Sequence, residues 1–233
     1  MKRLDVVCDR RHVLKALSLG AAASMASGLL AAELYQTAPM MEGPFYPDRL
    51  PLDTDNDLLL INNSITPAVG EITHVSGRIL SPAGEPVRNA FVEIWQADSS
   101  GAYLHSGTAN LDRRDSHFQG YGRFLTDSDG RYYFRTIKPS PYPGRCPHIH
   151  FGISENGHRI FTTQLFVSGH PGNARDVLYR LLPDEAARKS VTVDFRPVER
   201  SRLGELSARF DIVLGVTPAD PDDAAIRGGI GKT

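Results

Sequence analysis

Residues 139–153 read PSPYPGRCPHIHFGI, a loop broken by proline and glycine that runs into a short apolar strand. The loop carries Tyr142 and Arg145, and the strand carries His148 and His150. Side chains two residues apart on a strand point to the same face, so both imidazoles face the same way. Two imidazoles with a phenol just upstream predict half of a metal site. A surface pair or a hydrogen-bonded core pair is the alternative that these residues alone leave open.

Strand-like segments surround this stretch, and turn residues separate them at an even spacing. They cover residues 71–80, 91–97, 121–126, 131–137, 148–154, 159–167, 191–195 and 209–214. The pattern favours an antiparallel sandwich or barrel. The turn residues at 127–130 and 155–158 each predict a hairpin between the strands that flank them. Short helical segments are expected at 173–182 and 184–189.

Composition sets the outer limits of the prediction. With 233 residues and 41% hydrophobic content, the chain can bury one full core. The formal net charge is −1, with acidic and basic residues interspersed, so neither nucleic acid nor an anionic membrane surface is expected as a partner. The two cysteines, Cys8 and Cys146, lie in different predicted regions, so no disulfide framework is expected.

Residues 1–32 are expected to be a removable export signal. An arginine pair, Arg10 and Arg11, precedes Leu14, Lys15 and an uncharged run of small and apolar residues, which resembles a twin-arginine signal. The mature protein is therefore expected in the periplasm or secreted, with no stable membrane insertion. An uncleaved anchor is the alternative.

Three further regions are predicted in the rest of the chain. They are a proline-rich extended arm at 33–69, the β-sandwich domain at 70–215 and a flexible tail at 216–233.

The group around the histidine pair has three interpretations. The first is structural packing. The second is a cupin-like site in which Glu155 follows the two strand histidines, although the surrounding glycine spacing does not match that pattern. The third is a ferric site with two tyrosinates and two imidazoles, for which Tyr103 is the candidate second tyrosine because it follows a turn that can aim it into a shared cavity.

Several segments carry a resemblance to one family. They are VEIWQA at 92–97, GAYLH at 101–105, GRFLTDSDG at 122–130, FRTIKP at 134–139, PYP at 141–143, HIHF at 148–151 and TQL at 163–165. Together they resemble the intradiol ring-cleavage dioxygenases, and within that family most closely the β subunits of protocatechuate 3,4-dioxygenases. The resemblance runs from about residue 42 to 214 and implies a β-sandwich with an extended arm and one or two short helices.

The resemblance implies a non-haem Fe³⁺ enzyme that uses O₂ to cleave a catechol-type ring between its two hydroxylated carbons, giving a muconate-type diacid. The ferric ligands that it implies are Tyr103, Tyr142, His148 and His150, with Tyr142 as the ligand that substrate displaces. It also implies catalytic roles for Arg145 and Gln164. The substrate-lining residues that it implies are Gly43, Pro44 and Arg145.

The chain departs from the protocatechuate enzymes between Tyr142 and His148, where they carry a longer loop, and at Gly144, where they tend to have tryptophan. The mouth of the site is therefore expected to be more open, and the sequence leaves the particular catechol undetermined. A homo-oligomer is possible. The alternative from another functional class is a non-catalytic, prealbumin-like sandwich module that binds a ligand and retains the motifs for structural reasons.

Overall fold

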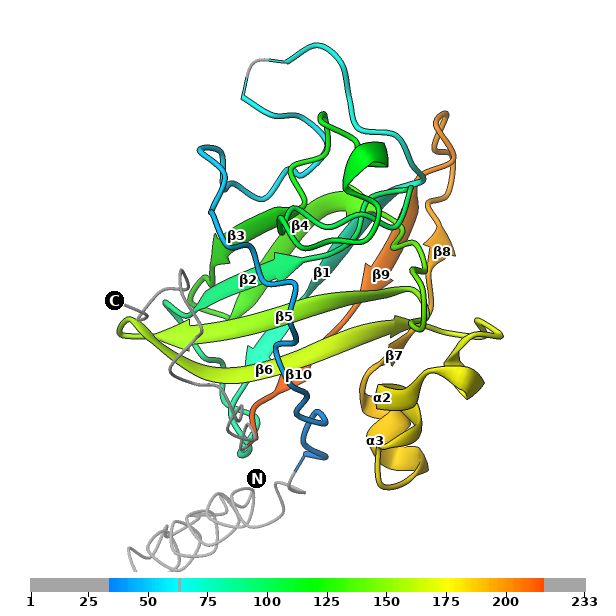
Figure 1. Ribbon diagram of the computed structural model, residues 1–233. Helices are drawn as coiled ribbons and strands as arrows, with labels where there is room; N and C mark the ends of the chain where they lie inside the picture. The colour runs from blue at the N-terminus through cyan, green and yellow to red at the C-terminus, as the bar shows by residue number, and fades with distance from the viewer. Residues whose placement is uncertain (1–33, 63, 216–233) are drawn as a thin grey trace, which may run out of the picture. The chain divides into compact units, whose positions relative to one another are not determined.

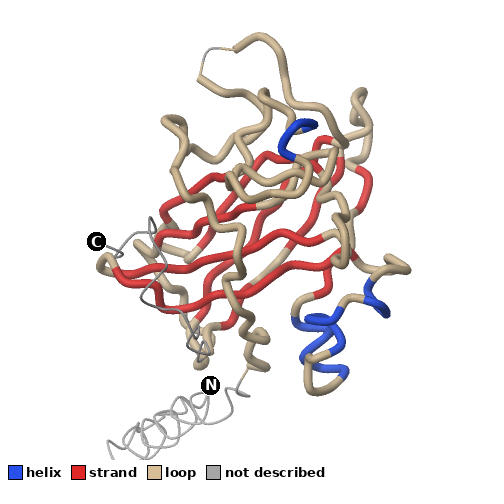
Figure 2. Tube along the Cα trace, viewed as in Figure 1, coloured by secondary structure: helices blue, strands red, loops and turns tan. Residues whose placement is uncertain are grey.

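A computed structural model describes residues 34–62 and 64–215 of the chain, which form two packed β-sheets (Figures 1 and 2). The first sheet contains β1 (Ile72–Leu80), β4 (Arg131–Ile137), β8 (Arg196–Pro197), β9 (Leu206–Arg209) and β10 (Ile212–Val213). The second contains β2 (Phe91–Trp95), β3 (Tyr121–Leu125), β5 (His148–Glu155), β6 (His158–Val167) and β7 (Thr192–Val193). The chain is thus the mainly β sandwich that the sequence predicts.

Strand β1 organises the first sheet. It pairs antiparallel with β4 along one edge and parallel with β9 and β10 along the other. Between β9 and β10 the chain passes very close to Gly77, where a Cβ atom would lie 1.8 Å from the carbonyl oxygen of Phe210. A side chain at position 77 would therefore clash with that backbone. The single strand predicted at 209–214 is consequently interrupted and begins earlier, at Leu206.

The second sheet has the order β3-β2-β5-β6-β7, with antiparallel pairs except for the short parallel pair of β6 and β7. The register places Trp95 opposite His150, and His150 opposite Gln164. These three side chains therefore form one row across β2, β5 and β6, on the same face of the sheet.

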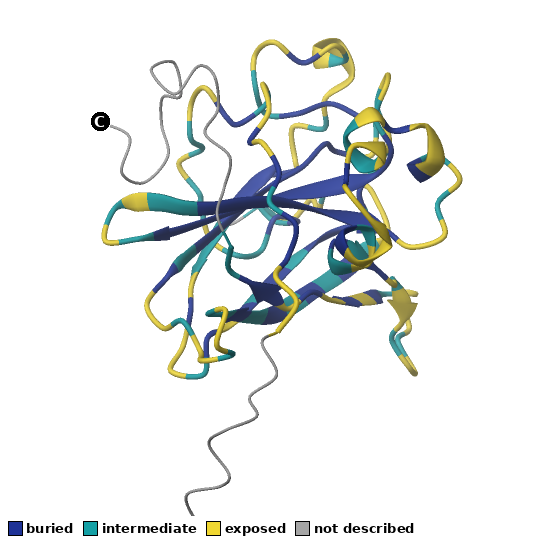
Figure 3. Ribbon diagram, turned by 90° about the horizontal axis from the view of Figure 1, so that it is seen from below, coloured by how far each residue is buried: buried dark blue, intermediate teal, exposed yellow. Residues whose placement is uncertain are grey.

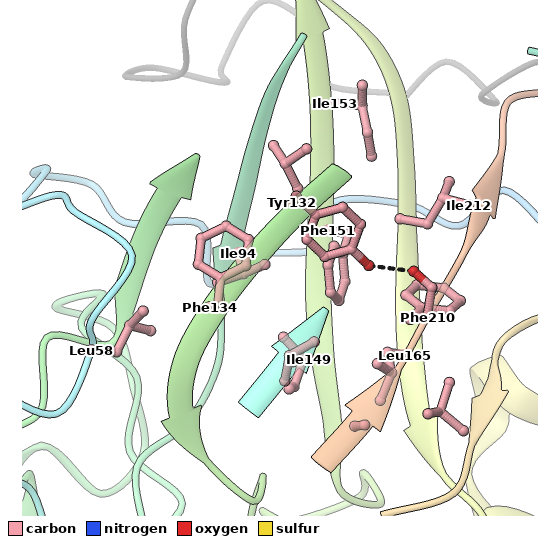
Figure 4. Packing of buried hydrophobic residues seen from close by; sticks show 14 of the residues in the cluster. Leu58, Ile94, Tyr132, Phe134, Ile149, Phe151, Ile153, Leu165, Phe210 and Ile212 are labelled. Atoms are coloured by element: carbon pink, nitrogen blue, oxygen red, sulfur yellow. Dashed lines mark hydrogen bonds between the residues drawn. The ribbon is translucent and has the colours of Figure 1, made fainter. Parts of the chain in front are cut away.

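The core lies between the two sheets. Alternate residues of the central strands face inward, including Ile94 on β2 and Ile149 and Phe151 on β5 (Figure 4). The hydroxyl of Tyr132 donates to the carbonyl oxygen of Phe210, so the one polar group of that buried ring is satisfied (Figure 4). Figure 3 shows buried residues along the strands and exposed residues gathered in the loops.

The N-terminal segment crosses the outer face of the second sheet (Figure 1). The amide of Met40 donates to the carbonyl of Thr162, and the Thr163 hydroxyl donates to the carbonyl of Ala38. Because this segment covers the outer face, residues on both faces of β5 and β6 are buried. The outer face can therefore hold polar side chains away from bulk water.

Short helices follow the second sheet. After a 3₁₀ turn, η3 (Asn173–Arg175), come α2 (Val177–Arg180) and α3 (Glu185–Ser190). The side chains of Asp176 and Asp184 cap α2 and α3, accepting hydrogen bonds from the amides of Tyr179 and Ala187. Another 3₁₀ turn, η2 (Leu111–Arg113), lies between β2 and β3. None of the helices in the described ranges has the length and apolarity that crossing a membrane requires.

One of the two predicted hairpins is confirmed and the other is wrong. Strands β5 and β6 pair around a turn in which Asn156 and Gly157 both have positive φ angles. Strands β3 and β4, in contrast, belong to different sheets. The turn between them closes, with the amide of Gly130 donating to the carbonyl of Asp127, but Gly130 then pairs with Ile79 of β1. The predicted signal and tail, 1–32 and 216–233, lie outside the described residues.

Candidate metal centre

Strand β5 supplies two imidazoles to the outer face of the second sheet. His148 and His150 alternate with core residues, and each side chain is buried. Their Nε2 atoms are 3.1 Å apart. Nδ1 of His148 donates to the carbonyl of Cys146 at 2.6 Å, which leaves Nε2 with a lone pair directed at the site. The ring of His150 stacks on Trp95, with centroids 4.9 Å apart and planes 10° from parallel.

Tyr103 reaches the same point from the loop after β2. The buried carboxylate of Asp98 accepts from the amides of Ser100 and Ala102 and so fixes this loop. Gly101, with φ +80°, lets the loop approach the neighbouring one, since a Cβ there would lie 2.9 Å from the Pro141 carbonyl. Tyr103 is buried, and its hydroxyl oxygen lies 3.2 and 3.1 Å from Nε2 of the two histidines.

Tyr142 approaches from the loop before β5. A tight turn, closed by the Arg145 amide donating to the Tyr142 carbonyl at 2.9 Å, presents a half-buried phenol. Its ring lies edge-on to Tyr103 at 5.3 Å and tilted against His148 at 5.6 Å. At the tip of the turn, Gly144 has φ +85°, and a Cβ there would meet no atom within 4 Å.

The structure therefore brings together the four side chains that the sequence selects. Tyr103 Oη and the two Nε2 atoms form a triangle with edges of 3.1–3.2 Å. Atoms that each lie about 2.1 Å from one ion, at right angles, are about 3 Å apart, so this triangle fits a shared cation. No group of three or more His, Cys, Asp or Glu side chains within 34–62 and 64–215 is placed to hold a metal. A metal at this point therefore needs the phenol oxygens, which suit a hard ion such as Fe³⁺.

Burial sets the charge state of these groups. It lowers the pKa of His148 to about 3, with the Arg145 charge adding to the effect, and it also lowers the pKa of His150 well below its ordinary range. Both imidazoles are therefore neutral at neutral pH and able to bind a cation. Burial raises the pKa of the Tyr103 phenol well above 10. A cation bound there would have to displace the phenol proton, so binding would release protons.

Arg145 stands beside this group with its guanidinium held on two sides. Nε donates to Asp176 at 2.8 Å, and Nη2 donates to Oε1 of the buried Gln164 at 2.6 Å. Nη1 then lies 3.4 Å from the Tyr142 hydroxyl oxygen. Burial raises the pKa of Tyr142, and the positive charge of Arg145 opposes that rise. The geometry thus supplies a fixed positive charge next to the most accessible phenol.

The arm contributes the outer wall. Gly43, with φ +76°, runs over the imidazole of His150, since a Cβ there would lie 3.7 Å from Cε1. Pro44 follows and is exposed. Phe45 stacks on Tyr103 at 5.1 Å and meets Tyr142 edge-on at 5.8 Å. The two arm residues selected from the sequence are thus next to the site, and Phe45 makes the aromatic contacts.

Three residues near the site were missed by sequence reasoning. Trp95 lies in the VEIWQA segment at 92–97, and only the pairing register of β2 with β5 indicates that it lies beside His150. Phe45 lies in a segment without periodicity. Asp176 is 31 residues from Arg145, and before a short helix it indicates only a cap.

Comparisons with known proteins show which proteins the chain is similar to. Residues 41–216 match the family model Dioxygenase_C, described as Dioxygenase. The protocatechuate 3,4-dioxygenase beta chain of Burkholderia cepacia is 38% identical over 180 residues, 73% of this chain and 75% of that one. Hydroxyquinol 1,2-dioxygenase of Corynebacterium glutamicum is 27% identical over 234 residues, 88% and 73% of the two chains. The solved dioxygenase domain of a dioxygenase carbohydrate-binding protein fusion from Streptomyces sp. SirexAA-E superposes with a TM-score of 0.58 at 31% identity, covering 78% of this chain and all of that one.

Proposed function

We infer the activity from one premise: the chain belongs to the intradiol ring-cleavage dioxygenase family, whose members are oxidoreductases. We propose that it binds Fe³⁺ and uses O₂ to open a catechol-type ring between the two hydroxylated carbons, producing a muconate-type diacid. The proposed ligands are Tyr103, Tyr142, His148 and His150.

One observation carries the proposal. The phenol oxygen of Tyr103 and the Nε2 atoms of both histidines converge to within 3.2 Å of one another, and all three side chains are buried. Neutral imidazoles and a phenol gathered in this way lack the protons to satisfy every lone pair, and a cation would satisfy all three atoms. The non-catalytic sandwich module gives no reason for this convergence, and the family membership does not favour it.

When bound, a ferric ion would supply Lewis acidity that withdraws electron density from the catechol oxygens. The remaining work falls to the side chains. Tyr142 is half-buried, whereas Tyr103 is buried, so Tyr142 is the ligand that could move away and, as a phenolate, take up a substrate proton at Oη. Arg145 can stabilise negative charge that develops on the bound ring. Gln164 holds the guanidinium in place.

The open turn supports a substrate class broader than protocatechuate. Because a Cβ at Gly144 would meet no neighbour, nothing in the described ranges presses on that tip. Gly43 and Pro44 would line the opposite side. We propose a catechol-type substrate without a strict requirement for a carboxylate substituent.

The test is spectroscopic and catalytic. Iron-loaded protein should absorb visible light through tyrosinate-to-iron charge transfer and should consume O₂ with catechol, protocatechuate or hydroxyquinol. Tyr103→Phe and Tyr142→Phe should each weaken or bleach the colour. Tyr133→Phe is the control, because its hydroxyl contacts His74 on β1 instead. A colourless wild-type protein that binds no iron would overturn the proposal.

We also propose that the protein is exported. The motif around Arg10 and Arg11 supports this, although it lies outside the described residues. Replacing both arginines by lysine should leave the protein in the cytoplasmic fraction, whereas periplasmic recovery of that variant would contradict a twin-arginine signal. A homo-oligomer stays a proposal that sedimentation can test.

A further inference from the structure

Asp176 is a buried carboxylate that joins the start of α2 to the loop before β5. Its side chain has no exposed surface. Oδ1 accepts from the amide of Tyr179 and caps α2, at 3.1 Å. Oδ2 accepts both Nε of Arg145, at 2.8 Å, and the backbone amide of Cys146, at 2.9 Å. A capping residue of a four-residue helix thus also contacts the loop that leads into β5.

The contact with Arg145 fixes the orientation of the guanidinium group. Asp176 binds Nε and Gln164 binds Nη2, so two edges of the planar guanidinium are occupied. The remaining nitrogen, Nη1, is the one near Tyr142. A planar group held at two of its edges cannot rotate its third edge away without breaking a hydrogen bond.

The contact with Cys146 fixes the orientation of the His148 imidazole. Asp176 holds the amide of Cys146, and the carbonyl of the same residue accepts from Nδ1 of His148 at 2.6 Å. The orientation of this imidazole therefore depends on a peptide segment that the carboxylate anchors.

A cap alone does not require a charge in this place. Asparagine and serine cap helices about as well as aspartate, and burying a carboxylate costs several kcal/mol unless it is paired. The pairing with Arg145 offsets that cost. Helix capping therefore does not account for a charged residue at position 176, whereas holding the guanidinium in place does.

We propose that Asp176 is a positioning residue that aims both the Arg145 guanidinium and the His148 imidazole at the candidate metal centre. The inference rests on the proposed function for its catalytic consequence. Its structural part concerns how the chain holds His148 and can be tested without turnover.

Asp176→Asn is the decisive variant. Asparagine keeps the size, the helix cap and one oxygen acceptor but loses the charge that pairs with Arg145. The matched control is Asp184→Asn, which changes the analogous cap of α3 without touching the site. In iron-loaded protein, kcat/KM should fall about 10–100-fold in Asp176→Asn and less than about twofold in Asp184→Asn. In an Arg145→Gln background, Asp176→Asn should cost less activity than it does in wild type, because only its contribution through Cys146 and His148 remains.

A second measurement does not depend on activity. Asp176→Ala removes the acceptor of the Cys146 amide, and release of iron to a chelator should be about tenfold faster than in wild type. Asp184→Ala should release iron at the wild-type rate. Thermal unfolding of each variant shows whether the comparison is made on folded protein. If Asp176 variants do not fold, Arg145→Lys serves instead: it keeps the charge, loses the planar contact and should lose activity to a similar extent.

The outcomes separate the two proposals. A wild-type protein that binds iron but does not turn over would refute the proposed activity, and the iron-release comparison would still decide the role of Asp176 toward His148. Active wild type with equal losses in the Asp176 and Asp184 variants would overturn the positioning role. So would fully additive effects with Arg145→Gln, or a fully active Arg145→Lys variant.

Discussion

Replacing Arg159 by methionine should destabilise the protein markedly, because this arginine is the positive charge of a buried ion-pair network. On the outer face of the second sheet, Arg159 donates to Glu93 at 2.6 Å and to Glu42 of the arm at 3.0 Å. The hydroxyls of Tyr46 and Tyr121 donate to the other oxygen of Glu93. The arginine thus bridges β2 and the arm that covers the candidate site.

The size of the effect follows from burial. The exposed fractions of the Arg159, Glu93 and Glu42 side chains are 10%, 0% and 4%. Removing one member of a buried ion pair leaves an uncompensated charge and costs about 3–5 kcal/mol. Methionine fills much of the same volume, so the cavity contribution is small. We therefore expect Arg159→Met to lower the free energy of unfolding by about 3–5 kcal/mol.

Urea unfolding of the iron-free chain, followed by fluorescence, measures this difference directly. Arg209→Met is the matched control, because Arg209 is 68% exposed and pairs with Asp211 at the surface. An exposed pair contributes about 0–1 kcal/mol. Proteolysis should also cleave the arm near Gly43 faster in Arg159→Met, since Glu42 loses its link to β2.

Equal free energies of unfolding for Arg159→Met and Arg209→Met would refute the reasoning. An unchanged rate of cleavage in the arm, despite a loss of about 3–5 kcal/mol, would show that the network stabilises the sheet and does not hold the arm.

Three further predictions concern single positions. Gly152→Ala should be about as destabilising as Arg159→Met in urea unfolding, and not additive with it, because a Cβ would lie 2.0 Å from Nη1 of Arg159. Burial, with the nearby Asp176 charge, raises the pKa of the Cys146 thiol from 9.0 to about 12, so alkylation at pH 8, followed by peptide mass spectrometry, should be about a thousandfold slower in the native protein than in urea. Although burial opposes it, hydrogen bonding lowers the pKa of Asp176 below 3.8. The contribution of the carboxylate to folding stability is therefore present above pH 3.8 and is lost as the pH falls through the lowered pKa. In urea unfolding, the stability difference between wild type and Asp176→Asn should shrink on acidification below about pH 4 and persist at neutral pH.

Local pattern in the sequence was enough to predict the histidine pair. Strand alternation alone places His148 and His150 on one face, and in the structure their Nε2 atoms are 3.1 Å apart. The turn before Tyr103 made it a candidate, and the family resemblance then selected it, because the approach of its loop to that of Tyr142 depends on a tertiary contact at Gly101.

The sequence-based prediction was wrong where the same turn residues are compatible with two tertiary arrangements. The turn at 127–130 closes as predicted, but turn residues do not determine which sheet the next strand joins, and β4 pairs with β1 instead of β3. Asp176 and Arg159 were missed for a related reason. Their oppositely charged partners lie at least 31 residues away along the chain, and no spacing rule connects them.

The pairing of the arm with the last strand has a consequence for how the chain folds. The amide of Thr37 donates to the carbonyl of Val213, and the amide of Val213 donates to the Thr37 hydroxyl, across 176 positions. Contacts of such high sequence separation form late and slow the search for the native state. A ribosome must therefore release nearly all of the described chain before the start of the arm can pair with β10. Until then the cover over the histidine face lacks this anchor, so iron added to nascent chains should be retained less well than iron added after folding is complete.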